Sequence, residues 1–158
     1  MKDTLFERSS TDGPADVEMS EHAERAVATA IDSAVAGGRR EDVTVMVYRA
    51  SDEMVALARD RRVQLILQGY PKNDAESLEI VRTASGYGLH HVCIPLARLT
   101  DPVLAASRRA GVSHIPYTFF EEDWSKASYQ RIFEEHLAGL ILPPGSGQRR
   151  FLELLGED

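Results

Sequence analysis

Short apolar runs that alternate regularly with longer amphipathic stretches constrain the fold of this chain more than any other feature. Residues 114–120 are β-branched and aromatic, residues 125–136 place apolar side chains at helical spacing, and residues 139–142 form a second apolar run that stops at two prolines. Apolar runs of this length, bounded by glycine and proline and separated by a helix, are typical of neighbouring parallel strands joined by a crossover.

The same pattern extends toward the N-terminus. Further strands are expected at 43–48, 63–68 and 91–96, with a weaker one at 4–7, and helices at 20–35, 51–59, 73–85, 100–110 and 148–155. Such alternation predicts parallel strands with right-handed crossovers. A length of 158 residues suits one domain, so the sequence predicts a single α/β domain over residues 1–158.

Two architectures accommodate this order of elements. One is a flavodoxin-like open sheet covered by helices on both faces, for which five or six strands in a chain of this length are ordinary. The other is part of a TIM-type β/α barrel, which when complete has about eight units and about 250 residues. The length of the chain alone favours the open sheet.

Composition narrows the classes of function. A formal net charge of -7 argues against general binding to nucleic acid or to an anionic membrane surface. No apolar stretch reaches membrane-spanning length, and the first ten residues lack the apolar core of a signal peptide. The single cysteine, Cys93, excludes a disulfide within the chain, which fits a reducing compartment. We therefore expect a cytoplasmic protein.

The later elements resemble the end of a glycerophosphodiester phosphodiesterase barrel. Gly111 ends a helix, Tyr117 and Thr118 form an aromatic–threonine pair in the next strand, and Gly139 opens a last apolar run that stops at Pro143. Upstream, the run 38–48 is similar to the family strand that ends in Ser-Phe-Asp. The similarity covers roughly residues 5–144, the C-terminal two-thirds of such a barrel, and it implies a partial TIM-type barrel.

The chain departs from this family in the residues that carry the family's chemistry. The family has Trp before the threonine, where this chain has Tyr117, and a Thr-Asp pair where it has Leu142 and Pro143. The family's His-Arg-Gly motif occurs nowhere in the sequence, and its Glu-X-Lys strand is broken because Ser9 stands two residues after Glu7. The resemblance implies metal-dependent hydrolysis of a phosphodiester in lipid metabolism. These gaps predict that the isolated chain does not catalyse it by the family mechanism.

In either architecture, ligands are expected at the carboxyl ends of the strands. Three carboxylates are expected there: Glu7 at one strand end, and Glu121 and Glu122 at another. Their oxygens are the ligands that magnesium and calcium prefer, and such an ion would polarise a phosphoryl oxygen. Glu7 and Glu121 are therefore the catalytic candidates. The alternative for residues 121–123 is a solvated loop that caps the next helix.

Arginines and a glycine-rich turn are the candidates for binding a phosphate. Arg49 and Arg98 follow strands and could clamp a phosphate through two N–H groups. Backbone N–H groups at a helix N-terminus favour anions, so the turn before the last helix is a phosphate cradle or, alternatively, a flexible connector. That turn consists of Gly145, Ser146 and Gly147 and is followed by Arg149. The residues expected to line a substrate site are Gln68, Tyr70, Tyr117 and Thr118.

The remaining reactive side chains are expected to be structural. His90, His91 and His114 fall at the amino ends of strands, the end of a barrel associated with stability. Cys93 lies in an apolar run and is expected to be an inert core residue.

A second, non-enzymatic function is compatible with the same sequence. The chain is then an α/β module that binds a small phosphorylated molecule near residues 145–150 or acts as a subunit. An open barrel wall exposes strand edges, so we also expect a homo-oligomer or a partner subunit.

Overall fold

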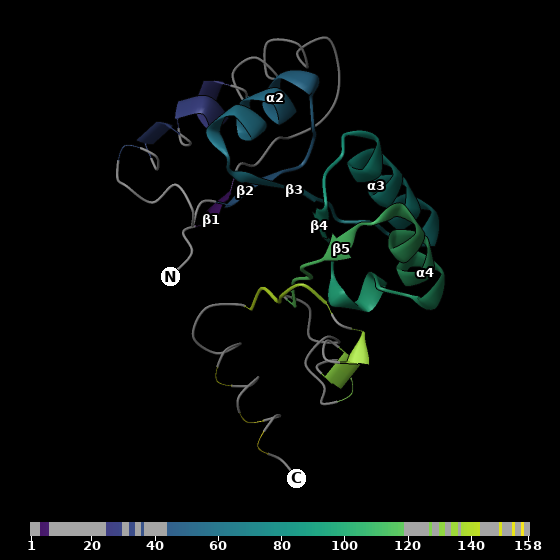
Figure 1. Ribbon diagram of the computed structural model, residues 1–158. Helices are drawn as coiled ribbons and strands as arrows, with labels where there is room; N and C mark the ends of the chain where they lie inside the picture. The colour runs from purple at the N-terminus through teal and green to yellow at the C-terminus, as the bar shows by residue number, and fades with distance from the viewer. Residues whose placement is uncertain are drawn as a thin grey trace. The chain divides into compact units, whose positions relative to one another are not determined.

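The computed structural model describes residues 4–6, 25–29, 32–33, 36, 44–118, 127, 130–131, 134–135, 137–142, 149, 153 and 156. The chain has two compact units, Met1–Gln68 and Gly69–Asp158. Strands and helices alternate along both units, as the sequence predicts (Figure 1). None of the described helices is both long enough and apolar enough to cross a membrane.

The first unit contains three parallel strands in chain order. Strand β1 (Thr4–Phe6) pairs with β2 (Thr44–Val47), and β2 pairs with β3 (Gln64–Gln68). Thr44 lies opposite Thr4 on one side and Gln64 on the other. A flavodoxin-like sheet would instead place its first strand between the second and the third, so this pairing is the one a barrel requires.

Strands β2 and β3 are buried almost without alternation. All four residues of β2 and the last four of β3 are buried. In a sequence, strands that are covered on both faces appear as continuous apolar runs. For this reason the apolar residues at 44–47 and 64–68 predicted these strands clearly. The weaker signal at the N-terminus also corresponds to a strand, β1.

Helix α2 (Asp52–Arg61) is bounded by local chemistry at both ends. The Ser51 hydroxyl accepts a hydrogen bond from the Met54 backbone N–H, at 3.2 Å. Arg62 ends the helix in the left-handed region, with φ of 57°, and the Val63 N–H returns to the Ala58 carbonyl. Met54 and Ala58 form its buried side.

The second unit contains helices α3 (Asp74–Gly86) and α4 (Asp101–Ala110), the short 3-10 helix η2 (Leu96–Arg98), and strands β4 (His91–Cys93) and β5 (Ser113–His114). Strands β4 and β5 are parallel, with Val92 opposite His114. Helices α3 and α4 pack side by side, in the teal and green part of Figure 1. The described helical residues 127, 130–131 and 134, and then 149, 153 and 156, fall in or next to the regions where the sequence predicts helices.

The strand ladder of the second unit continues past its formal ends as single bridges. Tyr117 bridges Pro95 on one side and Ile141 on the other, both in parallel. Prolines have no N–H to donate, so Pro95 and Pro116 interrupt the ladder and shorten β4 and β5 relative to the predicted runs 91–96 and 114–120.

Candidate functional site

The carboxyl ends of the strand segments in the second unit lie side by side. The Gly69 N–H donates to the Cys93 carbonyl, at 3.0 Å, and the Tyr117 N–H donates to the Ile94 carbonyl, at 3.2 Å. The Ile141 carbonyl accepts from the Thr118 N–H, at 3.1 Å. These three bonds bring together segments that are far apart in the sequence. We call the group Gly69, Tyr70, Arg98, Tyr117 and Thr118 the strand-end site.

A buried tyrosine and an exposed tyrosine form the centre of the strand-end site. Tyr117 is 0% exposed, and its hydroxyl donates to the Gly69 carbonyl, at 3.1 Å. The Tyr70 ring lies 5.4 Å from the Tyr117 ring, tilted by 60°. Tyr70 itself is 53% exposed. Tilted aromatic pairs at this separation attract each other, so Tyr117 supports an aromatic ring at the surface.

Gly69 lets helix α3 approach the strand-end site closely. A Cβ atom on Gly69 would lie 2.4 Å from Cδ1 of Ile80, so any larger residue would force Ile80 to move. Because Gly69 has no side chain, Ile80 packs directly against its backbone, next to Tyr70 in the chain.

Thr118 holds the last strand segment in place. It is 0% exposed, and its hydroxyl donates to the Ile141 carbonyl, at 3.3 Å, which its own N–H also contacts. The Thr118 hydroxyl is thus used in a hydrogen bond to the backbone of the last strand segment. Its role in lining a substrate site stays a prediction.

The basic side chains predicted to bind phosphate are exposed where the structure describes them. Arg98 is exposed in η2, directly after β4, and its backbone N–H donates to the Pro95 carbonyl. Arg49 is exposed two residues after β2 in the first unit, where Gln68 is the buried last residue of β3. Arg149 is exposed on a helical turn. Arg98 belongs to the second unit and follows β4, and the roles of Arg49, Gln68 and Arg149 in a site stay predictions.

The carboxylates predicted to hold a divalent cation lie outside the described residues. These are Glu7, Glu121 and Glu122, and the same holds for the turn Gly145, Ser146 and Gly147. Within the described part of the chain, no group of three or more His, Cys, Asp or Glu residues is arranged to hold a metal ion. The described residues therefore do not supply a set of ligands that fits magnesium or calcium.

Cys93 is the inert core residue that the sequence predicts. It is 0% exposed, and burial raises the pKa of its thiol to about 12. A thiol with such a pKa is protonated at neutral pH and is a poor nucleophile.

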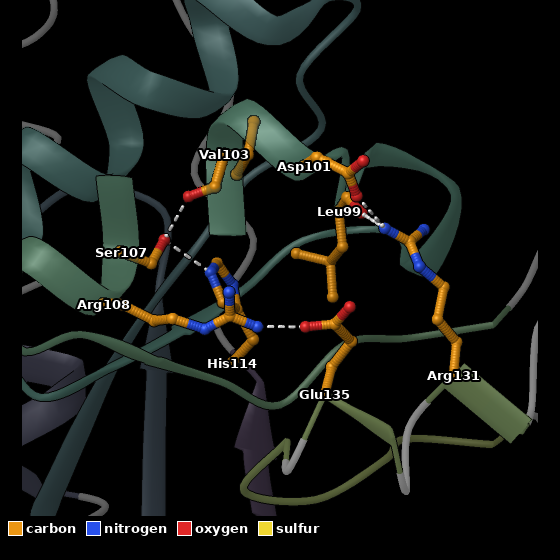
Figure 2. Close-up of polar contacts among 8 residues, drawn as sticks. All are labelled: Leu99, Asp101, Val103, Ser107, Arg108, His114, Arg131 and Glu135. Atoms are coloured by element: carbon orange, nitrogen blue, oxygen red, sulfur yellow. Dashed lines mark hydrogen bonds and ion pairs between the residues drawn. The ribbon is translucent and has the colours of Figure 1, made fainter. Parts of the chain in front are cut away.

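His114, at the amino end of its strand segment, has a partner that sequence analysis missed. Its Nε2 atom lies 2.7 Å from the Ser107 hydroxyl on α4, and both residues are buried (Figure 2). Burial lowers the pKa of His114 to about 4. A serine spaced with the apolar residues of α4 is the only sequence signal that could have pointed to this pair.

Comparison with known structures shows which fold the chain has. No protein-family model and no curated protein matches this chain in sequence. Three solved structures, each assigned as a glycerophosphoryl diester or glycerophosphodiester phosphodiesterase, share its fold. A Silicibacter pomeroyi protein is 17% identical, with a TM-score of 0.55, over 85% of this chain and 47% of its own. An Agrobacterium tumefaciens protein is 12% identical, with a TM-score of 0.59, over 83% and 52%. A Galdieria sulphuraria protein is 13% identical, with a TM-score of 0.58, over 93% and 53%.

The chain thus spans about half the length of the structures it matches. At these identities the likeness establishes the fold alone: alternating strands and helices that make up part of a β/α barrel. The predicted partial barrel and its resemblance to glycerophosphodiester phosphodiesterases are confirmed, and the flavodoxin-like alternative is wrong.

Proposed function

We propose that this chain binds a small glycerol phosphodiester at the carboxyl ends of its strands. The observation that carries the proposal is the likeness of fold, which covers 83% to 93% of the chain in three structures assigned to one kind of phosphodiesterase. Ligands of β/α barrels bind at this end of the strands. In the second unit the strand-end site occupies that position.

The strand-end site offers two kinds of contact to such a ligand. Arg98 presents an exposed guanidinium, whose N–H groups can match the oxygens of a phosphodiester in two parallel hydrogen bonds. Tyr70 presents an aromatic ring, supported from below by Tyr117, against which the carbon skeleton of the ligand can pack. Arg49, Arg149 and the turn at 145–147 stay predictions as further phosphate contacts.

Hydrolysis is the finer part of the proposal and rests on the resemblance. It would use magnesium or calcium held by Glu7, Glu121 and Glu122, with Glu7 and Glu121 as the catalytic residues, and it would place the protein in lipid metabolism. These carboxylates lie outside the described residues, so no chemical step is derived from them. Binding at the strand-end site is the part that the described residues support.

Glycerophosphocholine tests both parts in one set of samples. In an NMR titration we expect saturable binding to the wild type. The affinity should fall by at least about tenfold in Arg98→Gln, because a charge-assisted hydrogen bond contributes roughly 1.5–3 kcal/mol. Arg109→Gln is the matched control, since Arg109 is also exposed but lies in the last turn of α4. Equal affinities of the two variants, or no binding to the wild type, would contradict the proposal.

The same samples, followed by phosphorus NMR with magnesium, with calcium and with a chelator, separate binding from catalysis. Turnover that the chelator abolishes, and that Glu7→Gln and Glu121→Gln also remove, would establish metal-dependent hydrolysis. Binding without turnover under any condition would identify the chain as a binding module with a phosphodiesterase fold.

A further inference from the structure

We propose that His114, Ser107 and the Val103 carbonyl form an acid-sensitive latch. The latch holds strand β5 on helix α4 while the imidazole is neutral and releases it when the ring takes up a proton. The latch consists of two hydrogen bonds in series (Figure 2). The Ser107 hydroxyl donates to the Val103 carbonyl, at 2.8 Å, and lies 2.7 Å from His114 Nε2.

The directions of these bonds fix the tautomer of His114. A serine hydroxyl has one hydrogen, and the Ser107 hydrogen is used on the Val103 carbonyl. Ser107 must therefore accept at His114, so Nε2 carries the hydrogen and Nδ1 carries the lone pair. His114 is 2% exposed, and its Nδ1 atom has no hydrogen-bond partner within the described part of the chain.

Protonation would leave a new donor and a new charge without compensation. A proton on Nδ1 creates an N–H group in a buried position where no described acceptor meets it. The imidazolium would also lose the hydration that it has in water. Both effects favour conformations in which the ring reaches solvent, and they explain why burial lowers the pKa of His114.

The charged groups around the latch largely neutralise one another. On one side Arg108 of α4 pairs with Glu135 (Figure 2). On the other, Arg131 donates to the Leu99 carbonyl and lies 3.6 Å from Asp101. Among the described residues, the carboxylates of Glu135 and Asp101 therefore each lie beside a guanidinium.

Strand β4 and helix α3 also lie near the latch, and α3 carries the carboxylates of Asp74 and Glu76 in its first turn. Val92 faces His114 across the ladder, and because side chains alternate along a strand, His91 and Cys93 lie on the opposite face of β4. On α3, which packs on α4, Glu79 and Arg82 form an exposed ion pair with each other.

His114 is well placed to act as a latch because it lies against three segments. Its side chain holds α4, its position in the ladder opposite Val92 holds β4, and its carbonyl accepts from the Ala138 N–H, at 2.9 Å. Release of the ring would loosen the junction of these segments while the first unit keeps its own strand pairing.

The pH window follows from the direction of the shift. A free histidine titrates near 6.5, and His114 in the folded protein titrates at about 4. Between these values the released form binds a proton that the folded form does not, so the latch weakens as pH falls from about 6.5 to about 4. The equilibrium constant for release should rise by about tenfold per pH unit within this window.

Hydrogen exchange and histidine NMR on the full chain test the latch. At pH 7 we expect His114 to be the Nε2–H tautomer. Between pH 6.5 and 4.5, after correction for intrinsic exchange rates, the amides of Val112 and Ile115 should lose protection by about tenfold per unit relative to amides of β3. Both amides bond within the second unit, to the Ser107 and Val92 carbonyls.

Two variants distinguish release of the latch from a general loss of stability in acid. His114→Gln keeps a donor for Ser107 but does not titrate, so it should abolish this differential loss of protection. His90→Gln changes an exposed histidine and should leave it unchanged. The proposal is overturned if His114 titrates near 6.5, if it is the Nδ1–H tautomer, or if the differential loss persists in His114→Gln. The titration and the tautomer of His114 are measured on the wild-type chain. These two measurements therefore test the proposal even if a variant does not fold.

Discussion

At the scale of single residues, the Tyr117 hydroxyl is the group whose removal is easiest to interpret. Its hydrogen bond to the Gly69 carbonyl joins two segments 48 residues apart, and Tyr117 itself is 0% exposed. We expect Tyr117→Phe to lower the free energy of unfolding by about 1 kcal/mol in urea titrations, the usual contribution of such a bond. Tyr87→Phe is the matched control, because the Tyr87 hydroxyl bonds to none of the described residues, and an equal loss there would contradict the assignment.

Sequence analysis predicted which residues lie at strand ends more readily than the contacts between them. The position of Tyr70 and Tyr117 at strand ends was predictable because strand ends follow from the alternation of apolar runs. The pairing of their rings and the bond to Gly69 were not, since these contacts depend on which strand segments become neighbours. Ser107 was missed for the same reason: its partner, His114, lies on another element.

At the scale of elements, the helix caps provide a matched pair of substitutions. The Asn73 side chain accepts from the Glu76 N–H, at 3.0 Å, whereas the N-cap of α4, Thr100, makes no side-chain capping bond and has a buried hydroxyl without a described partner. We expect Asn73→Ala to cost about 1 kcal/mol of unfolding free energy. Thr100→Ala should stay within about 0.5 kcal/mol of the wild type. Equal losses in thermal or urea unfolding would refute this difference.

Helix boundaries were predictable because caps are local. Ser51 and Asn73 start their helices as expected, Glu76 accepts from the neighbouring Lys72 N–H, and Gly111 ends α4 with φ of 67°. Strand lengths were harder to predict from the sequence, because they depend on the neighbouring strands as well as on the composition of the strand itself. The prolines at 95 and 116 reduce the predicted strands to short ladders and single bridges.

At the scale of the whole molecule, the alternation of apolar runs predicted an α/β fold. It did not decide between an open sheet and a partial barrel. Open sheets and barrels both alternate strands and helices, and only the order of pairing distinguishes them. The chain-order pairing of β1, β2 and β3, together with the structural likeness, identifies the partial barrel. The single domain, the cytoplasmic location and the self-association or partner subunit stay predictions.

The central claim is that a glycerol phosphodiester binds at the strand-end site, and chemical-shift mapping of the backbone amides tests it most directly. On titration with glycerophosphocholine, we expect the largest changes at Gly69, Tyr70, Arg98 and Thr118, whose backbones lie at the carboxyl ends of the strand segments. Changes centred instead on the opposite ends, around Gly111 and Ser113, or no changes at millimolar ligand, would contradict the claim.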